Sequence, residues 1–243
     1  MKRFGVISCA DQEKWGFSEA IVSRYLECYK TNCDEEWVGF HARRGQVPVL
    51  EDLQKFDGFM ISGSVESAND DVDWILKLQE LIRSAPNLDK PPKIVGICFG
   101  HQLIAKALGG KVGFNPDKDF VLQTEVIRTS NEGVKAKAIK GLFEDGPIRA
   151  VQSHGECITE LPKGAVSLGT SATCEHEIVQ FTENILGIQS HPDMSTHEAE
   201  TLILPSISKR YNWDSEKVDK TSASFKLEDN AKTINEISRE IYK

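Results

Sequence analysis

The sequence predicts an α/β protein with a doubly wound, mostly parallel sheet flanked by helices and extended by antiparallel strands. Two observations carry this prediction. In the first half of the chain, short apolar runs alternate with amphipathic helical patterns, which is typical of parallel strands joined by crossover helices. In the second half, short strand patterns follow one another with only turn residues between them, which favours antiparallel pairing.

The first half supplies four strands and the helices between them. Short apolar runs predict the strands Phe4–Ser8, Glu36–Phe40, Gly58–Ser62 and Lys93–Ile97. Apolar residues at helical spacing predict the helices Phe17–Tyr29, a short turn at Val49–Leu53, Asp71–Ser84 and His101–Leu108. In such a sheet, ligands bind at the carboxyl ends of the parallel strands, so we expect the functional site there.

The second half adds shorter strands and a last helix. The strand candidates are Lys111–Phe114, Gln123–Arg128, Ile148–Val151, Val166–Thr170, Glu177–Phe181 and Ile185–Ile188. After Pro205 the chain becomes polar, and a helical pattern returns at Ala231–Tyr242. Since no internal repeat is visible, we expect a single domain over residues 1–243, with a core to about residue 207 and residues 208–243 as an appendage that carries a docked helix.

Composition narrows the classes of partner and cofactor. The net charge of -8, from 37 acidic and 29 basic residues, argues against a general affinity for nucleic acid or anionic membranes. The six cysteines form no Cys-x-x-Cys pair, so neither a zinc site nor a dithiol motif is indicated, and we expect no metal or cofactor. Scattered thiols, a short apolar run at the start and no bilayer-length apolar segment predict a cytoplasmic protein.

A Gly-x-Cys-x-Gly pattern stands where the fourth strand meets its helix. Gly96 and Gly100 flank Cys98 at two residues' distance on either side. A sharp strand-to-helix turn exposes the residue at its corner and leaves no room for neighbouring side chains, which explains the glycines. The helix N-terminus behind the corner favours a thiolate. A lone cysteine after an apolar strand is more often a small buried residue, so Cys98 needs partners before it can be read as a nucleophile.

Two further segments are predicted to reach the same edge of the sheet. Gly63 follows the third strand, and we expect its N–H and that of Phe99 to form an oxyanion hole; that Gly63 merely turns the chain is an equally good interpretation. His191 ends an apolar strand that Pro192 terminates, and Asp193 stands two residues beyond the histidine. A thiol nucleophile needs a base, and the base needs a carboxylate that orients it, which Cys98, His191 and Asp193 would supply.

These motifs together resemble those of the class I glutamine amidotransferases. The resemblance covers roughly Met1–Ile207 and rests on Gly96–Gln102, Gln189–Asp193, Ser62–Ser64 and Gln152–His154. It implies the flavodoxin-like fold of that family, with Cys98 as nucleophile, His191 as base and then acid, and Asp193 as orienting group. It further implies substrate contacts at Ser153 and His154, and that Gln102 either contacts the glutamyl end of the substrate or supports the pocket. The family usually carries glutamate where this chain has Asp193, whose side chain is one methylene shorter.

The resemblance implies attack of a thiolate on a γ-glutamyl amide and hydrolysis of the resulting thioester. Ser62–Ser64, Asp71–Leu78 and Gly96–Gln102 are most similar to the stand-alone γ-glutamyl peptidases of the superfamily, so the leading hypothesis is a hydrolase of glutathione conjugates or other γ-glutamyl peptides. A second hypothesis is a glutaminase subunit that supplies ammonia to a separate synthetase. A third is a catalytically silent regulatory homologue, which Asp193 motivates. The sequence does not indicate an oligomeric state.

Overall fold

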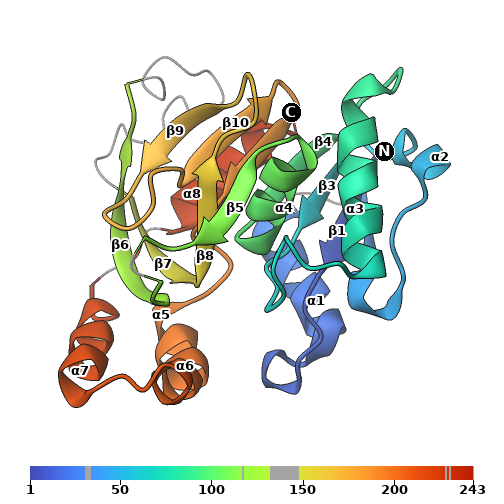
Figure 1. The fold of residues 1–243 in the computed structure, drawn as a ribbon. Coiled ribbons are helices and arrows are strands. Elements are labelled where there is room, and N and C mark those ends of the chain that lie inside the picture. The colour runs from blue at the N-terminus through green and yellow to red at the C-terminus, as the bar shows by residue number, and fades with distance from the viewer. Residues whose placement is uncertain (31–33, 117, 132–147, 228, 230, 243) are drawn as a thin grey trace.

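The described part of the computed structural model, residues 1–30, 34–116, 118–131, 148–227, 229 and 231–242, is built around a nine-stranded sheet (Figure 1). The strand order is β2-β1-β3-β4-β11-β10-β9-β6-β7. The strands are β1 (Lys2–Ser8), β2 (Glu35–His41), β3 (Gly58–Ile61), β4 (Lys93–Ile97), β6 (Val121–Thr129), β7 (Ile148–His154), β9 (Val166–Thr170), β10 (Ile178–Thr182) and β11 (Ile185–Ile188). A separate pair consists of β5 (Lys111–Phe114) and β8 (Glu156–Glu160).

The sheet changes character at β11. The strands β2, β1, β3, β4 and β11 run parallel to one another, whereas each pairing from β11 through β10, β9 and β6 to β7 is antiparallel. The predicted fold class, a mostly parallel sheet with an antiparallel extension, is therefore confirmed. β11 comes last of the strands in the chain but pairs with β4, so the end of the strand region returns to the centre of the sheet.

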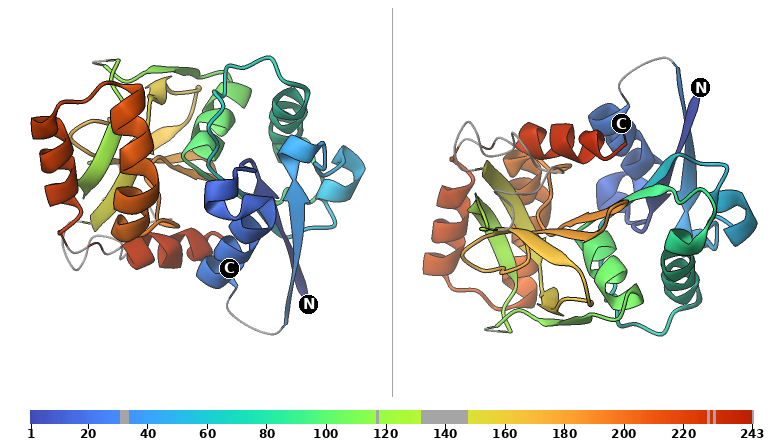
Figure 2. Two further views of the ribbon diagram at one scale, coloured as in Figure 1. Left: turned by 90° about the horizontal axis from the view of Figure 1, so that it is seen from below. Right: turned by 90° about the horizontal axis from the view of Figure 1, so that it is seen from above.

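Helices cover the parallel part of the sheet on both sides. The α-helices are α1 (Phe17–Tyr29), α2 (Leu50–Leu53), α3 (Asp73–Ser84), α4 (Phe99–Ala107), α5 (Thr196–Glu198), α6 (Leu204–Arg210), α7 (Ser215–Ser224) and α8 (Ala231–Glu240). In both views of Figure 2, α3 and α4 lie on one face, and α1 and α8 lie on the other. Consecutive residues of one strand therefore enter different cores: Phe59 packs with the α3–α4 side and Met60 with the α1 side.

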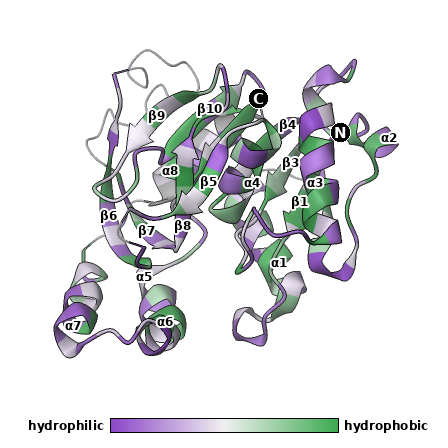
Figure 3. Cartoon of the chain, in the orientation of Figure 1, coloured by the Kyte–Doolittle hydropathy of each residue, from purple (hydrophilic) through white to green (hydrophobic). Residues whose placement is uncertain are grey.

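Burial on both faces explains why the central strands are continuous apolar runs. The hydrophobic colour follows β3 and β4, while α3 shows a hydrophobic stripe and a hydrophilic one (Figure 3).

Within the described residues no helix is both long and apolar enough to cross a membrane.

The structure differs from the sequence-based expectation mainly beyond β4. The elbow helix begins at Phe99, not His101, directly after Cys98. One strand, β8, and three α-helices, α5, α6 and α7, were not predicted, and the last helix ends at Glu240 rather than Tyr242. Helix α7 buries only Thr221 and is started by the Asp214 side chain, which accepts a hydrogen bond from the Lys217 N–H, so an apolar pattern could not reveal it.

The C-terminal helix is tied to the centre of the molecule. The Tyr242 hydroxyl donates to the Phe59 carbonyl oxygen at 2.8 Å, and the Asn235 amide donates to the Pro192 carbonyl oxygen at 3.0 Å. Through Asn235 the helix therefore holds the segment that follows β11.

Candidate active site

Cys98 occupies a strained corner between β4 and α4. Its φ of 50° and ψ of -103° lie in a region that residues with a side chain rarely adopt. A Cβ at Gly100 would lie 2.4 Å from the Ile61 carbonyl oxygen, and a Cβ at Gly96 would lie 2.5 Å from the Gly100 carbonyl. The glycines on both sides are therefore needed for close backbone packing, as the Gly-x-Cys-x-Gly pattern predicts.

His191 lies just beyond β11, beside the elbow. Its backbone N–H donates to the Val151 carbonyl oxygen at 2.8 Å, which anchors it to β7. Its Nδ1 lies 3.2 Å from the Asp193 Oδ1, and both side chains are about nine-tenths buried. The aspartate thus comes within hydrogen-bonding distance of the ring despite its shorter side chain.

The electrostatics of this group favour its charged forms. Burial by itself lowers the pKa of His191, but the charges of a Cys98 thiolate and of Asp193 outweigh it and raise the pKa to about 10. Burial likewise raises the pKa of Asp193, yet the charge and hydrogen bond of His191 and the charge of Arg24 hold that pKa below its usual value. At neutral pH the arrangement therefore stabilises the imidazolium form of His191.

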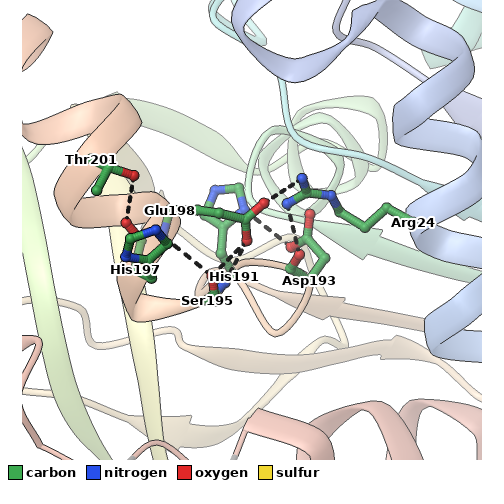
Figure 4. A network of polar contacts seen from close by, with 7 residues as sticks. All are labelled: Arg24, His191, Asp193, Ser195, His197, Glu198 and Thr201. Carbon is green, nitrogen blue, oxygen red and sulfur yellow. Dashed lines mark hydrogen bonds and ion pairs between the residues drawn. The ribbon is translucent and has the colours of Figure 1, made fainter.

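A second set of contacts holds Asp193 in place and was not expected from the sequence. Arg24 of α1 donates to the Asp193 carbonyl oxygen at 3.1 Å and to the Glu198 carboxylate at 2.6 Å (Figure 4). Glu198 also closes a reciprocal cap with Ser195 at the start of α5. The Ser-x-x-Glu spacing of this cap is visible in the sequence, but nothing local links it to Arg24.

Gly63 lies against both candidate catalytic residues. A Cβ at this position would lie 2.9 Å from the His191 Cε1 and 3.8 Å from the Cys98 Cβ. The preceding Ser62 hydroxyl accepts a hydrogen bond from the Cys9 N–H at 2.8 Å, which ties this turn to the end of β1. Any side chain at position 63 would therefore press on the imidazole.

The residues expected to contact substrate lie close to the nucleophile. The Ser153 carbonyl oxygen is 3.7 Å from the Cys98 Sγ. The Gln102 amide nitrogen donates to the Glu156 carbonyl oxygen at 2.7 Å and to the Gln189 Oε1 at 3.0 Å. Its nitrogen thus braces the pocket wall.

His154 is buried and uncharged. Its Nδ1 lies 3.0 Å from the Asn115 Oδ1 and 3.1 Å from the Glu156 carbonyl oxygen, two acceptors that place the proton on Nδ1. Burial lowers the pKa of His154 to about 3, so the ring is neutral at physiological pH.

One cavity of about 460 Å³ unites these groups. All eight residues that the sequence predicts for the site line it: Gly63, Cys98, Phe99, Gln102, Ser153, His154, His191 and Asp193. The turn Gln12–Trp15 and the end of α6 line it too, and no sequence pattern pointed to them. In the described part of the chain, no three histidine, cysteine or acidic side chains form a group that could hold a metal ion.

Comparisons with known proteins identify relatives of this chain. The family model "Glutamine amidotransferase class-I" matches residues 15–207. Gamma-glutamyl peptidase 3 of Arabidopsis thaliana is 37% identical over 201 residues, which are 79% of this chain and 77% of that protein. Gamma-glutamyl peptidase 4 of the same plant is 39% identical over 159 residues, or 65% of this chain and 62%, less than two thirds, of that protein.

Solved structures show the same fold. A glutamine amidotransferase from Thermotoga maritima superposes with a TM-score of 0.69, covering 100% of this chain and 98% of that one. Its sequence identity is 16%, so this likeness concerns the fold alone.

Proposed function

The chain belongs to the class I glutamine amidotransferase family, whose relatives indicate a hydrolase, and we propose that it cleaves γ-glutamyl amide bonds through a Cys98 thioester. The observation that carries the proposal is the position of His191. The His191 ring lies beside Cys98, its Nδ1 faces the Asp193 carboxylate, and the pKa of His191 is raised to about 10. A buried imidazolium of this kind stabilises a thiolate at neutral pH.

In the first half of the reaction, the Cys98 thiolate attacks the γ-carbonyl carbon. The negative charge moves to the carbonyl oxygen, where the Gly63 and Phe99 N–H groups would receive it. In the described residues neither N–H donates a hydrogen bond within the protein, so both are free for this role. As the C–N bond breaks, the His191 imidazolium gives its proton to the leaving amine, and a γ-glutamyl thioester remains on Cys98.

In the second half, water cleaves the thioester. Neutral His191 takes a proton from the water molecule while the water oxygen attacks the thioester carbonyl carbon. The C–S bond then breaks, glutamate leaves, and the thiolate–imidazolium pair is restored. Asp193 holds the ring in one orientation throughout and compensates the charge on the imidazolium.

Two observations favour a γ-glutamyl peptide over glutamine as the proposed substrate class. Two relatives, at 39% and 37% identity, carry the name gamma-glutamyl peptidase. The cavity of about 460 Å³ is also in the range of about 300–1,000 Å³ that holds drug-sized ligands, which leaves room for a leaving group larger than ammonia.

The proposal is tested by incubating the purified chain with glutamine, glutathione and a glutathione S-conjugate, and by measuring released glutamate by mass spectrometry. The Cys98→Ala variant is the matched control. We expect glutamate from the two peptides, no release by the variant, and a γ-glutamyl adduct on Cys98 in quenched samples. Turnover of glutamine alone would instead support the hypothesis of a glutaminase subunit. If no substrate is turned over and no adduct forms on Cys98, the hypothesis of a catalytically silent homologue is supported.

A further inference from the structure

The lining of the cavity contains cations that have no acidic partner in the described structure. Three acids line the cavity, and each is already engaged: Asp193 with His191, Glu66 with Arg43 at 2.7 Å, and Glu156, which accepts from the Ser67 hydroxyl at 2.6 Å.

Among the cations that line the cavity, Arg24 is bound to Glu198 and to the Asp193 carbonyl oxygen. Lys14 and Arg210 form no ion pair with any described residue. Among the described residues the cavity therefore offers two positive charges without an ion pair, those of Lys14 and Arg210, and one carboxylate without an ion pair, that of Glu156, whose oxygen accepts from the Ser67 hydroxyl.

Lys14 is held at the cavity by its neighbour in the turn. Its Nζ lies 5.4 Å from the centre of the Trp15 ring, and burial lowers the pKa of the ammonium group. Trp15 packs against the α1-side core that contains Met60 and against a further apolar cluster that contains Leu122 and Val151, so its position is fixed. A partly desolvated ammonium without a counter-ion gains more from binding an anion than a fully hydrated one does.

Gln12, in the same turn, has a side-chain amide without hydrogen-bond partners in the described part of the chain. Its side-chain amide lines the cavity, and both its nitrogen and its oxygen are buried without a hydrogen-bond partner among the described residues. Since a buried amide left unpaired costs free energy, a group with both hydrogen-bond donors and acceptors would satisfy it. A peptide unit of a bound substrate has both.

Arg210 stands at the end of α6. Its guanidinium lies 5.8 Å from the centre of the Tyr211 ring, and both residues line the cavity. Arg210 and Lys14 are both exposed residues. The helix end and the turn are 195 residues apart in the sequence, from Trp15 to Arg210, and only the fold brings them to one cavity.

We propose that Gln12, Lys14 and Arg210 form the subsite for the leaving group and recognise the carboxylate of the amino acid or dipeptide that is released. This inference rests on the proposed function and deepens it. The subsite would distinguish γ-glutamyl peptides, whose leaving group carries a carboxylate, from glutamine, whose leaving group is ammonia. Gln12 would bind the peptide unit, and the two cations would bind the terminal carboxylate.

The test measures binding apart from catalysis. The Cys98→Ala chain is titrated by calorimetry with γ-glutamyl-cysteinyl-glycine and with the same peptide ending in a carboxamide, which differs only in the leaving-group carboxylate. Lys14→Gln and Arg210→Gln are added singly and together to this background. Lys209→Gln serves as the control, because it removes the same charge one residue from Arg210 and does not line the cavity.

We expect the acid to bind more tightly than the carboxamide, and each cation variant to weaken the acid about five-fold while leaving the carboxamide unchanged. The double variant should lose the preference, and the control should keep it. Equal affinities for the two peptides, equal weakening of both by the variants, or no binding of either would overturn the inference. Failure of the proposed function would look different: binding and preference would persist while the unmodified chain released no glutamate.

Discussion

The Asp193→Asn variant tests the electrostatic role of the carboxylate beside His191. Asp193 Oδ1 lies 3.2 Å from the His191 Nδ1, and both side chains are about nine-tenths buried. At this distance Coulomb's law gives at most about 5 kcal/mol for an effective dielectric constant of about 20. Since about 1.4 kcal/mol corresponds to a factor of ten in rate, we expect kcat to fall by about 10²- to 10⁴-fold.

The assay is the pH dependence of turnover of a chromogenic γ-glutamyl anilide. In the unmodified chain the raised pKa of His191, about 10, keeps the imidazolium charged until the pH rises through that value. Without the carboxylate the pKa of His191 falls, so the thiolate–imidazolium pair, and with it the activity, should be lost at a lower pH. Stability against urea is measured alongside, to confirm that the variant folds.

Asp193→Glu is the matched variant because it keeps the charge and lengthens the side chain by one methylene. It should retain far more activity than Asp193→Asn. The pH above which its turnover declines should stay near that of the unmodified chain. Near-normal turnover by Asp193→Asn, with an alkaline limb that does not move, would refute the assigned role of this carboxylate.

Three further variants probe the elbow, the oxyanion site and a buried acid. In Gly63→Ala the new Cβ lies 2.9 Å from the His191 Cε1, so kcat should fall by about 10²-fold with little change in urea stability, and normal turnover would contradict the contact. In Gly100→Ala the Cβ lies 2.4 Å from the Ile61 carbonyl oxygen, so unfolding in urea should show a loss of about 1–3 kcal/mol; an unchanged midpoint would count against the close packing. Burial raises the pKa of Glu177 to about 7, so its folded form holds a proton that the unfolded chain releases above about pH 4.5, and stability declines as the pH rises from there to about 7. Glu177→Gln should remove that decline, and its free energy of unfolding at pH 8 should exceed that of the unmodified chain by up to about 3 kcal/mol. Identical pH profiles of stability for the two chains would show that the pKa of Glu177 is not raised.

Local patterns in the sequence were sufficient for the parallel half of the fold. The central strands are apolar on both faces, and the helices between them carry apolar residues at helical spacing, so both kinds of element can be recognised one at a time. They failed for α7, which buries one residue and depends on a capping side chain, and for β8, whose short run pairs only with β5. For β8 long-range pairing decides the structure, and a short segment does not encode it. For α7 the apolar stripe that a sequence pattern detects is missing.

The sequence by itself determined the chemistry at two strand ends: a cysteine on a corner that only glycines can flank, and a histidine with a carboxylate two residues away. The resemblance it supports, to class I glutamine amidotransferases, is confirmed by the family model and the relatives. Only the tertiary structure decided that these ends meet, because β11, the last strand in the chain, pairs with β4 and so sets His191 beside Cys98.

The tertiary structure also decided what surrounds this pair. Arg24 reaches Asp193 from a helix that lies 169 residues earlier in the chain, and the turn Gln12–Trp15 shares a cavity with the end of α6. A sequence motif records contacts between residues that are close in the chain, since those contacts follow from local geometry. Contacts between distant segments follow from how the sheet orders its strands and where its helices pack, and here these contacts shape the substrate side of the site.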